Sequence, residues 1–174
     1  MRSRLAAVGA SALVLGLLAG CGGGDAASNG QVAGSSAAPL VSQPTPPGEV
    51  VRPGPGTPKR VAAALVKGKP MVVAFFLPGA ADDDAVRQAL RQARSSAAGR
   101  GVTFFVYTLD QSKRFGDLPE LLDVTLTPAV AVIGRDQRLV NLFRGLVDAE
   151  LLQQAMGDAK DTEPVRRPAP SKKP

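Results

Sequence analysis

Residues 69–84 read KPMVVAFFLPGAADDD, and this stretch decides the fold class. Its apolar run Met71–Phe76 is rich in β-branched and aromatic residues and is bounded by Pro70 and by Pro78-Gly79. Such a run indicates a strand that is buried on both faces, as the strands of parallel sheets are. The sequence therefore predicts a buried strand over residues 71–76.

A helix and a second strand are predicted after this run. Apolar residues recur at helical spacing at Val86, Ala89, Leu90, Ala93 and Ala97, which predicts an amphipathic helix that opens with three acidic residues and ends near Gly99. Val102–Thr108 is a second apolar run with β-branched residues. Strand, helix and strand form one right-handed crossover, so the two strands are expected to be parallel neighbours. The chain is therefore assigned to the α/β class.

One domain is predicted over residues 58–157, in which no internal repeat is visible. Helices are expected at Pro58 to Lys67, at Leu118 to Val124, and from the capping residue Asp148 through Met156. The apolar stretches 129–133 and 139–143 flank a short polar turn and predict a β-hairpin.

The order of these elements resembles the thioredoxin fold, an α/β fold with a four-stranded mixed sheet and helices on both faces. Lys69-Pro70 before a strand that ends in Phe75-Phe76 is similar to the strand that precedes the active-site loop of that family. The stretch 124–129, Val-Thr-Leu-Thr-Pro-Ala, is similar to the segment that carries the family's cis-proline, and Gly145 is similarly placed before the last helix. The resemblance covers about half of the chain.

The sequence departs from the family at the redox residues. The positions of the two active-site cysteines fall near Ala80 and Asp83, with Ala81 and Asp82 between them, and the position of the buried acid falls near Ala74. The chain has one Cys and no His, so it has no thiol pair, no Ser-His-Asp triad and no imidazole ligand. The resemblance therefore implies the fold but not the disulfide chemistry.

The N-terminus predicts export and lipidation. Arg2 and Arg4 precede the apolar stretch Leu5–Leu18, which is typical of a secretory signal peptide, here assigned to residues 1–20. The following Leu18-Ala19-Gly20-Cys21 resembles the lipobox of bacterial lipoproteins, and that resemblance implies that acyl chains such as palmitate are attached at Cys21. The alternative is a conventional secretory signal after which Cys21 is an ordinary small residue. Lipidation would place the chain on the cell membrane, facing outside the cytoplasm.

Two further segments have biased composition. Residues 21–57 are rich in Gly, Ser and Pro and are expected to form a disordered tether. Residues 158–174 are basic and Pro-rich and are expected to form a disordered tail, which either attracts anionic lipid or wall polymers or only aids solubility. Nucleic acid is not an expected partner, because the net charge of +6 is modest and no aromatic residues are interleaved with the basic ones.

Charged residues at the predicted helix have two interpretations. Asp82, Asp83 and Asp84 resemble a metal-binding or acid/base cluster, but adjacent residues on a helix diverge. The favoured interpretation is that one Asp caps the helix and the others complement its dipole, with no metal bound. The arginines of the helix, Arg87, Arg91 and Arg94, are expected to form a solvated face paired in part with Asp83 and Asp84.

The remaining candidate site joins Thr127-Pro128 to Ala80 and Ala81. The family resemblance implies a cis bond at Pro128 and a peptide partner bound beside it, whereas the alternative is that Pro128 only shapes the turn into the hairpin. The two loops are expected to meet at one end of the sheet. Small residues at 80 and 81 would make this surface shallow and suited to holding a peptide.

These observations predict a membrane-anchored, redox-inactive binding or scaffold module for an envelope protein or peptide. No catalytic residue, metal or cofactor is assigned to it. The alternative is an enzyme, either of the thioredoxin-like superfamily or a metal-dependent hydrolase that uses Asp82–Asp84.

Overall fold

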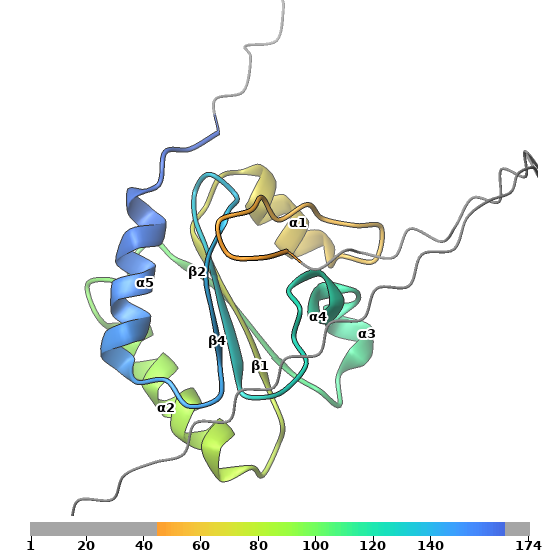
Figure 1. Cartoon of the computed structure of the whole chain (residues 1–174), viewed down its shortest axis with the longest axis vertical. Helices are drawn as coiled ribbons and strands as arrows, with labels where there is room; N and C mark the ends of the chain where they lie inside the picture. The colour runs from red at the N-terminus through yellow and green to blue at the C-terminus, as the bar shows by residue number, and fades with distance from the viewer. Residues whose placement is uncertain (1–44, 166–174) are drawn as a thin grey trace, which may run out of the picture. The chain divides into compact units, whose positions relative to one another are not determined.

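The computed structural model describes residues 45–165 of the chain (Figure 1). The predicted signal peptide, Cys21, the first part of the tether and residues 166–174 of the tail lie outside the described residues. Within residues 45–165 no helix has the length and apolar character needed to span a membrane.

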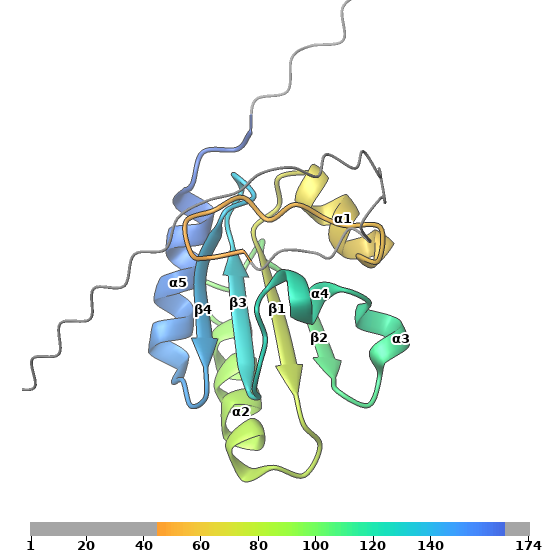
Figure 2. The same cartoon turned by 45° about the vertical axis from the view of Figure 1, so that its right-hand side comes forward.

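A four-stranded mixed sheet forms the centre of the domain, which confirms the predicted α/β class (Figure 2). Its strands are β1 (Met71–Phe76), β2 (Thr103–Thr108), β3 (Ala129–Ile133) and β4 (Leu139–Arg144), in the order β2-β1-β3-β4. The β1–β2 pair is parallel, as the crossover predicts, and the other two pairs are antiparallel.

Helices cover both faces of this sheet (Figure 1). On one face lie α2 (Ala81–Ser95) and α5 (Ala149–Asp161), whose apolar residues pack with alternate residues of β1. On the other face lie α1 (Lys59–Val66), α3 (Ser112–Phe115) and α4 (Leu118–Leu121).

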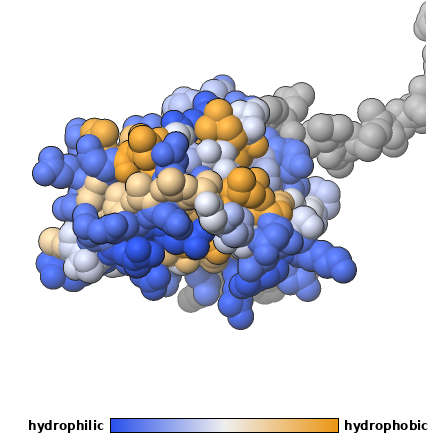
Figure 3. All heavy atoms as spheres, turned by 90° about the horizontal axis from the view of Figure 1, so that it is seen from below, coloured by the Kyte–Doolittle hydropathy of each residue, from blue (hydrophilic) through white to orange (hydrophobic). Residues whose placement is uncertain are grey.

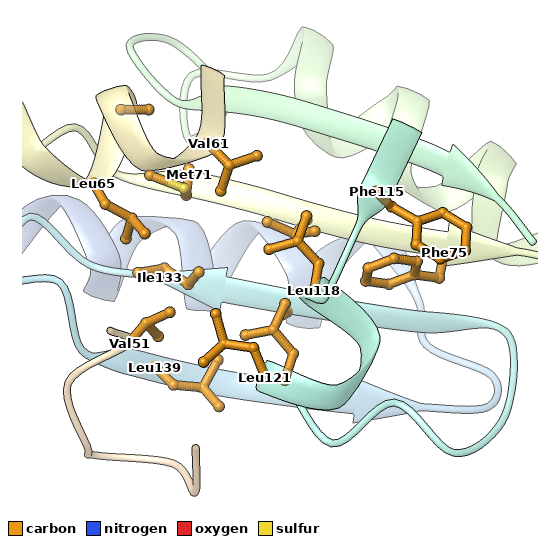
Figure 4. Close-up of a cluster of buried hydrophobic side chains, with 14 of the residues drawn as sticks. Val51, Val61, Leu65, Met71, Phe75, Phe115, Leu118, Leu121, Ile133 and Leu139 are labelled. Carbon is orange, nitrogen blue, oxygen red and sulfur yellow. The ribbon is translucent and has the colours of Figure 1, made fainter. Parts of the chain in front are cut away.

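Strand β1 is buried along its whole length because it contributes to both cores. Successive side chains of a strand point to opposite faces, so Met71, Val73 and Phe75 enter the core under α1 and α4, shown in Figure 4. Val72, Ala74 and Phe76 enter the core under α2 and α5. Burial of large apolar side chains contributes about 1.5–3 kcal/mol each, which explains why this run determines the fold.

The tether is shorter than its composition predicts. Residues 45–51 run along the domain, where Val51 is 1% exposed within the core and its N–H donates to the carbonyl of Gln137 at 2.8 Å. Val50 forms an antiparallel bridge with Arg138, and the N–H of Thr45 donates to Leu121 O at 2.9 Å. Val51 supplies the apolar contact that the average composition of residues 21–57 conceals.

Helix boundaries also differ from the prediction, and one helix was not predicted. Helix α2 ends at Ser95, before the predicted end near Gly99, because the hydroxyl of Ser96 donates a hydrogen bond to the carbonyl of Ala93 at 2.7 Å and turns the chain. Helix α5 continues through Gly157 to Asp161, since Ala159 is buried against the sheet, so the predicted tail begins within this helix. The short helix α3 was not predicted, because its four residues are too few to show periodicity.

Candidate functional site

The two predicted site loops lie at the same end of the sheet. Phe75 near the end of β1 pairs with Ala129 at the start of β3, and Ala129 pairs with Arg144 at the end of β4. The loop 77–80, the loop 125–128 and the turn 145–148 that leads into α5 therefore all lie at the same end of the sheet. The structure thus brings Ala80 and Ala81 to the end of the sheet that also carries Thr127 and Pro128.

The loop before β3 is braced at two points. The Thr127–Pro128 peptide bond is cis, as the resemblance implies, and the buried Pro128 accepts a hydrogen bond through its carbonyl from the N–H of Gly145 at 2.8 Å. Upstream, the Nη2 of Arg144 donates to Oδ2 of Asp123 at 2.5 Å and to its carbonyl at 2.9 Å. This second brace was not predicted, because no local pattern links residues that are 21 positions apart.

Between these braces the backbone is free. Within the described part of the chain, no backbone hydrogen bond outside helices and strands involves residues 125–127. Their N–H and C=O groups are therefore open to water or to another chain at the point where β3 begins.

The side chain of Asp83 holds the loop between β1 and α2 in place. This carboxylate is 2% exposed, and its Oδ1 accepts the N–H of Leu77 at 2.5 Å. The expectation that an Asp caps α2 is wrong: the capping position is Ala80, which makes no side-chain capping bond. Because the helix begins at Ala81, all three acids lie in its first turn, where Asp83 turns inward under the loop and Asp82 and Asp84 are exposed.

The arginines of α2 do not pair with these acids. The ion pairs formed within residues 45–165 join Arg138 to Asp136 and Arg144 to Asp123, so neither involves α2. Instead the guanidinium of Arg87 lies 4.8 Å from the ring centroid of Phe76, and that of Arg94 lies 5.2 Å from the centroid of Phe104. The expected pairing is wrong because the side chains turn sideways over these aromatic rings.

The acidic residues do not form a metal site in the part of the chain that is described. No group of three or more Asp, Glu, Cys or His side chains within residues 45–165 is arranged to hold an ion. The inward turn of Asp83 toward Leu77 separates it from its exposed neighbours.

Exposed leucines lie in the two loops and in the turn 145–148. Leu77, Leu126 and Leu146, here called the leucine patch, are 48%, 50% and 67% exposed. Leu77 and Leu146 follow the ends of β1 and β4, and Leu126 precedes the start of β3, all at this end of the sheet. Figure 3, which views the domain from this end, shows orange apolar residues among paler and blue ones. The patch was not predicted, although Leu77 precedes Pro78, Leu146 follows Gly145 and Leu126 lies in the cis-proline segment. Grouped exposed apolar residues of this kind mark interaction sites.

Solved structures show which fold this arrangement has. A putative thiol:disulfide interchange protein DsbE from Chlorobium tepidum matches with a TM-score of 0.51 and 15% identity, over 66% of this chain and 98% of that one. The domain has a thioredoxin-like fold. Trxlp from Edwardsiella tarda matches the thioredoxin-like domain with a TM-score of 0.49 and 15% identity, over 56% of this chain and 90% of that one. Mitochondrial thioredoxin 3 from Saccharomyces cerevisiae matches with a TM-score of 0.47 and 18% identity, over 57% and 87%. The sequence matches no protein-family model and no curated protein.

The small residues Ala80 and Ala81 of the thioredoxin-like domain lie where the loop after β1 meets α2. Ala80 precedes the helix and Asp83 lies in its first turn, while Ala74 is fully buried in β1. The single Cys of the chain is Cys21, so no thiol lies in this loop. What this end of the domain offers chemically is free backbone, the leucine patch and small side chains.

Proposed function

We propose that this chain is a membrane-anchored lipoprotein whose thioredoxin-like domain binds an extended peptide segment of another envelope protein without thiol chemistry. The observation that carries the proposal is the juxtaposition of free backbone at residues 125–127 with the leucine patch. The anchor rests on the lipobox that ends at Cys21.

The proposed contact is a short edge-strand pairing. An extended peptide beside Thr127 would bond the free N–H and C=O groups, while Leu77, Leu126 and Leu146 would contact its apolar side chains. The braces at Gly145 and Asp123 support this geometry, because they hold the loop in place before the peptide arrives.

The enzymatic alternatives have less support. A redox enzyme of this superfamily would need a thiol that residues 45–165 lack. A metal-dependent hydrolase would need Asp82–Asp84 to converge, whereas Asp83 bonds the loop. Turnover of a disulfide substrate by the full chain carrying Cys21→Ala would contradict the proposal.

Thr127→Arg tests the binding face. A bulky charge beside the leucine patch should reduce the yield of each cross-linked partner about tenfold, which corresponds to a loss of about 1.4 kcal/mol. The measurement is quantitative mass spectrometry of partners captured from cross-linked cells. The melting temperature should stay nearly unchanged, since substitutions at the surface usually alter stability by no more than about 0.5 kcal/mol.

Gln154→Arg is the matched control, because it adds the same charge at an exposed position on α5. It should leave the captured partners at wild-type yield. Equal yields from wild type and Thr127→Arg would remove this surface from the proposal, and so would equal losses in both variants.

A further inference from the structure

A second surface lies at the free edge of β2, away from the leucine patch. β2 is the outermost strand of the sheet, with β1 as its one neighbour among the described residues (Figure 2). The N–H of Thr103 donates to Pro70 O at 2.9 Å and the N–H of Leu109 donates to Phe76 O at 3.0 Å. Because the backbone groups of a strand alternate in direction, those of Phe104 and Val106 point away from β1. Val106 is also 44% exposed, so this edge is open.

Unpaired cations follow this edge on the α2 face. Arg94 lies over Phe104 at the start of β2, and Arg87 lies over Phe76, which pairs with Thr108 at the end of β2. Arg91 lies between them on the same stripe of the helix. The Nε and Nη2 of Arg87 are buried without an acceptor in the part of the chain that is described.

Cations also flank the opposite face of β2. Arg114 and Arg60 lie close enough to Tyr107 for their charges to oppose the rise in the pKa of this side chain that burial causes. Both are exposed. The neighbouring acids Asp82–Asp84 and Asp110 lie beyond the end of β2. The α2 face of the edge is therefore positive from Phe104 onward, and the opposite face is positive near Tyr107.

We propose that the free edge of β2 binds an extended acidic segment of another protein as a fifth strand of the sheet. Main-chain hydrogen bonds to Phe104 and Val106 would supply the pairing. Adjacent acidic side chains of the segment point to opposite faces, so they would reach Arg91 and Arg94 on one face and Arg114 on the other. These charge contacts would set the register of the pairing and the choice of partner.

The charge of the edge argues against two other occupants. A second copy of the chain would bring two rows of arginines together, and like charges across paired strands are destabilising. The chain's own segments outside the described residues do not match either, because residues 22–44 carry one acid, Asp25, and residues 166–174 carry only basic charges. An acidic segment of a different protein is the occupant that fits.

The test measures binding of a labelled, capped peptide in which pairs of adjacent glutamates alternate with single valines, so that glutamates lie on both faces of the strand, using fluorescence anisotropy and the full chain. Val106→Pro removes the outward N–H without removing a bond to β1, so the strand should persist as an edge strand. It should weaken binding about fivefold to tenfold, whereas Val106→Thr, which keeps the donor, should bind as wild type does. Arg91→Glu with Arg94→Glu should weaken binding further, and added salt should weaken it in wild type.

Controls separate this proposal from the proposed function. Thr127→Arg should leave binding of the acidic peptide unchanged, and the peptide should slow hydrogen exchange at Phe104 and Val106 and not at Leu77. Any of three results with the peptide would overturn the proposal: equal binding by wild type and a folded Val106→Pro, equal binding of a peptide with lysine in place of glutamate, or protection confined to the leucine patch. Self-association that Val106→Pro abolishes would overturn it in favour of a second copy.

Discussion

At the scale of single residues, Asp83 links the candidate site to the core. Three consecutive aspartates look alike in sequence, and the pattern alone assigns them all to the helix N-terminus. Only packing distinguishes them, because the position of Asp83 in the first turn of α2 directs its side chain toward Leu77 while its neighbours face water. Which carboxylate turns inward could therefore not be predicted.

Replacing Asp83 with Ala should lower the free energy of unfolding by about 1–3 kcal/mol, since it leaves the N–H of Leu77 without its acceptor. Denaturant unfolding of the full chain measures the loss. Asp84→Ala is the matched control, because it removes an exposed charge from the same turn and should cost about 0.3–1 kcal/mol through the helix dipole alone. Equal losses for the two variants would show that the bond to Leu77 contributes nothing.

Tyr107 predicts how stability depends on alkaline pH. Burial raises the pKa of Tyr107 above its ordinary value of 10.0, and the charges of Arg114 and Arg60 oppose this rise. A raised pKa means that the folded chain keeps the phenolic proton at a pH where the unfolded chain loses it. The contribution to stability is therefore complete below pH 10 and declines as the pH rises through the raised pKa.

Tyr107→Phe should remove this part of the alkaline decline and keep the ring contacts with Phe75 and Phe115. The measurement is the free energy of unfolding against pH for both proteins. Because Tyr107 is the only tyrosine and the chain has no tryptophan, its absorbance reports the titration directly. Parallel curves for the two proteins would contradict the prediction.

At the scale of elements, strong periodicity predicted helices and strands correctly, whereas average composition did not predict the contacts of residues 45–51. β1 and α2 were predicted because each repeats one pattern over many residues, and packing then follows that pattern. Residues 45–51 contain only one pair of valines among prolines and glycines, so nothing local shows that Val51 completes the core beside Ile133 and Leu139 (Figure 4). Tertiary contact, and not propensity, orders this segment.

Val51→Ala should therefore lower the free energy of unfolding by about 2 kcal/mol, the loss expected for two buried methyl groups and the cavity that they leave. Thermal and denaturant unfolding measure it. Val66→Ala, at a half-exposed position of α1, is the control and should stay within about 0.5 kcal/mol of wild type. If residues 45–57 were only a tether, both variants would be neutral.

At the scale of the whole molecule, the sequence predicts the fold more fully than the site. The resemblance of residues 124–129 to the family's cis-proline segment implied the cis bond at Pro128, and the order of elements predicted that the two loops meet at one end of the sheet. It did not predict the leucine patch or the brace between Arg144 and Asp123, because these depend on which side chains the strand ends bring together. Contacts between distant residues leave no local pattern.

The attachment of the molecule to the membrane is tested at Cys21. Cys21→Ala should abolish labelling with radioactive palmitate and leave uncleaved precursor, because in the proposed lipoprotein the thiol accepts the diacylglyceryl group that carries acyl chains and precedes cleavage. Gel mobility and cell fractionation show the result. Labelling at the wild-type level in this variant would show that the chain is not lipidated there.

The path of residues 45–51 has a mechanical consequence for such an anchored protein. Among the described residues, a pull from the N-terminal side meets a series of backbone bonds, from Thr45 to Leu121, Gly48 to Leu139 and Val51 to Gln137. A pull directed away from the domain loads these bonds one after another, so they break one at a time. Residues 45–51 would thus detach and extend to a length of about 20 Å before the pull displaces Val51 from the core. In the proposed lipoprotein, the domain would stay folded while its distance to the membrane changes.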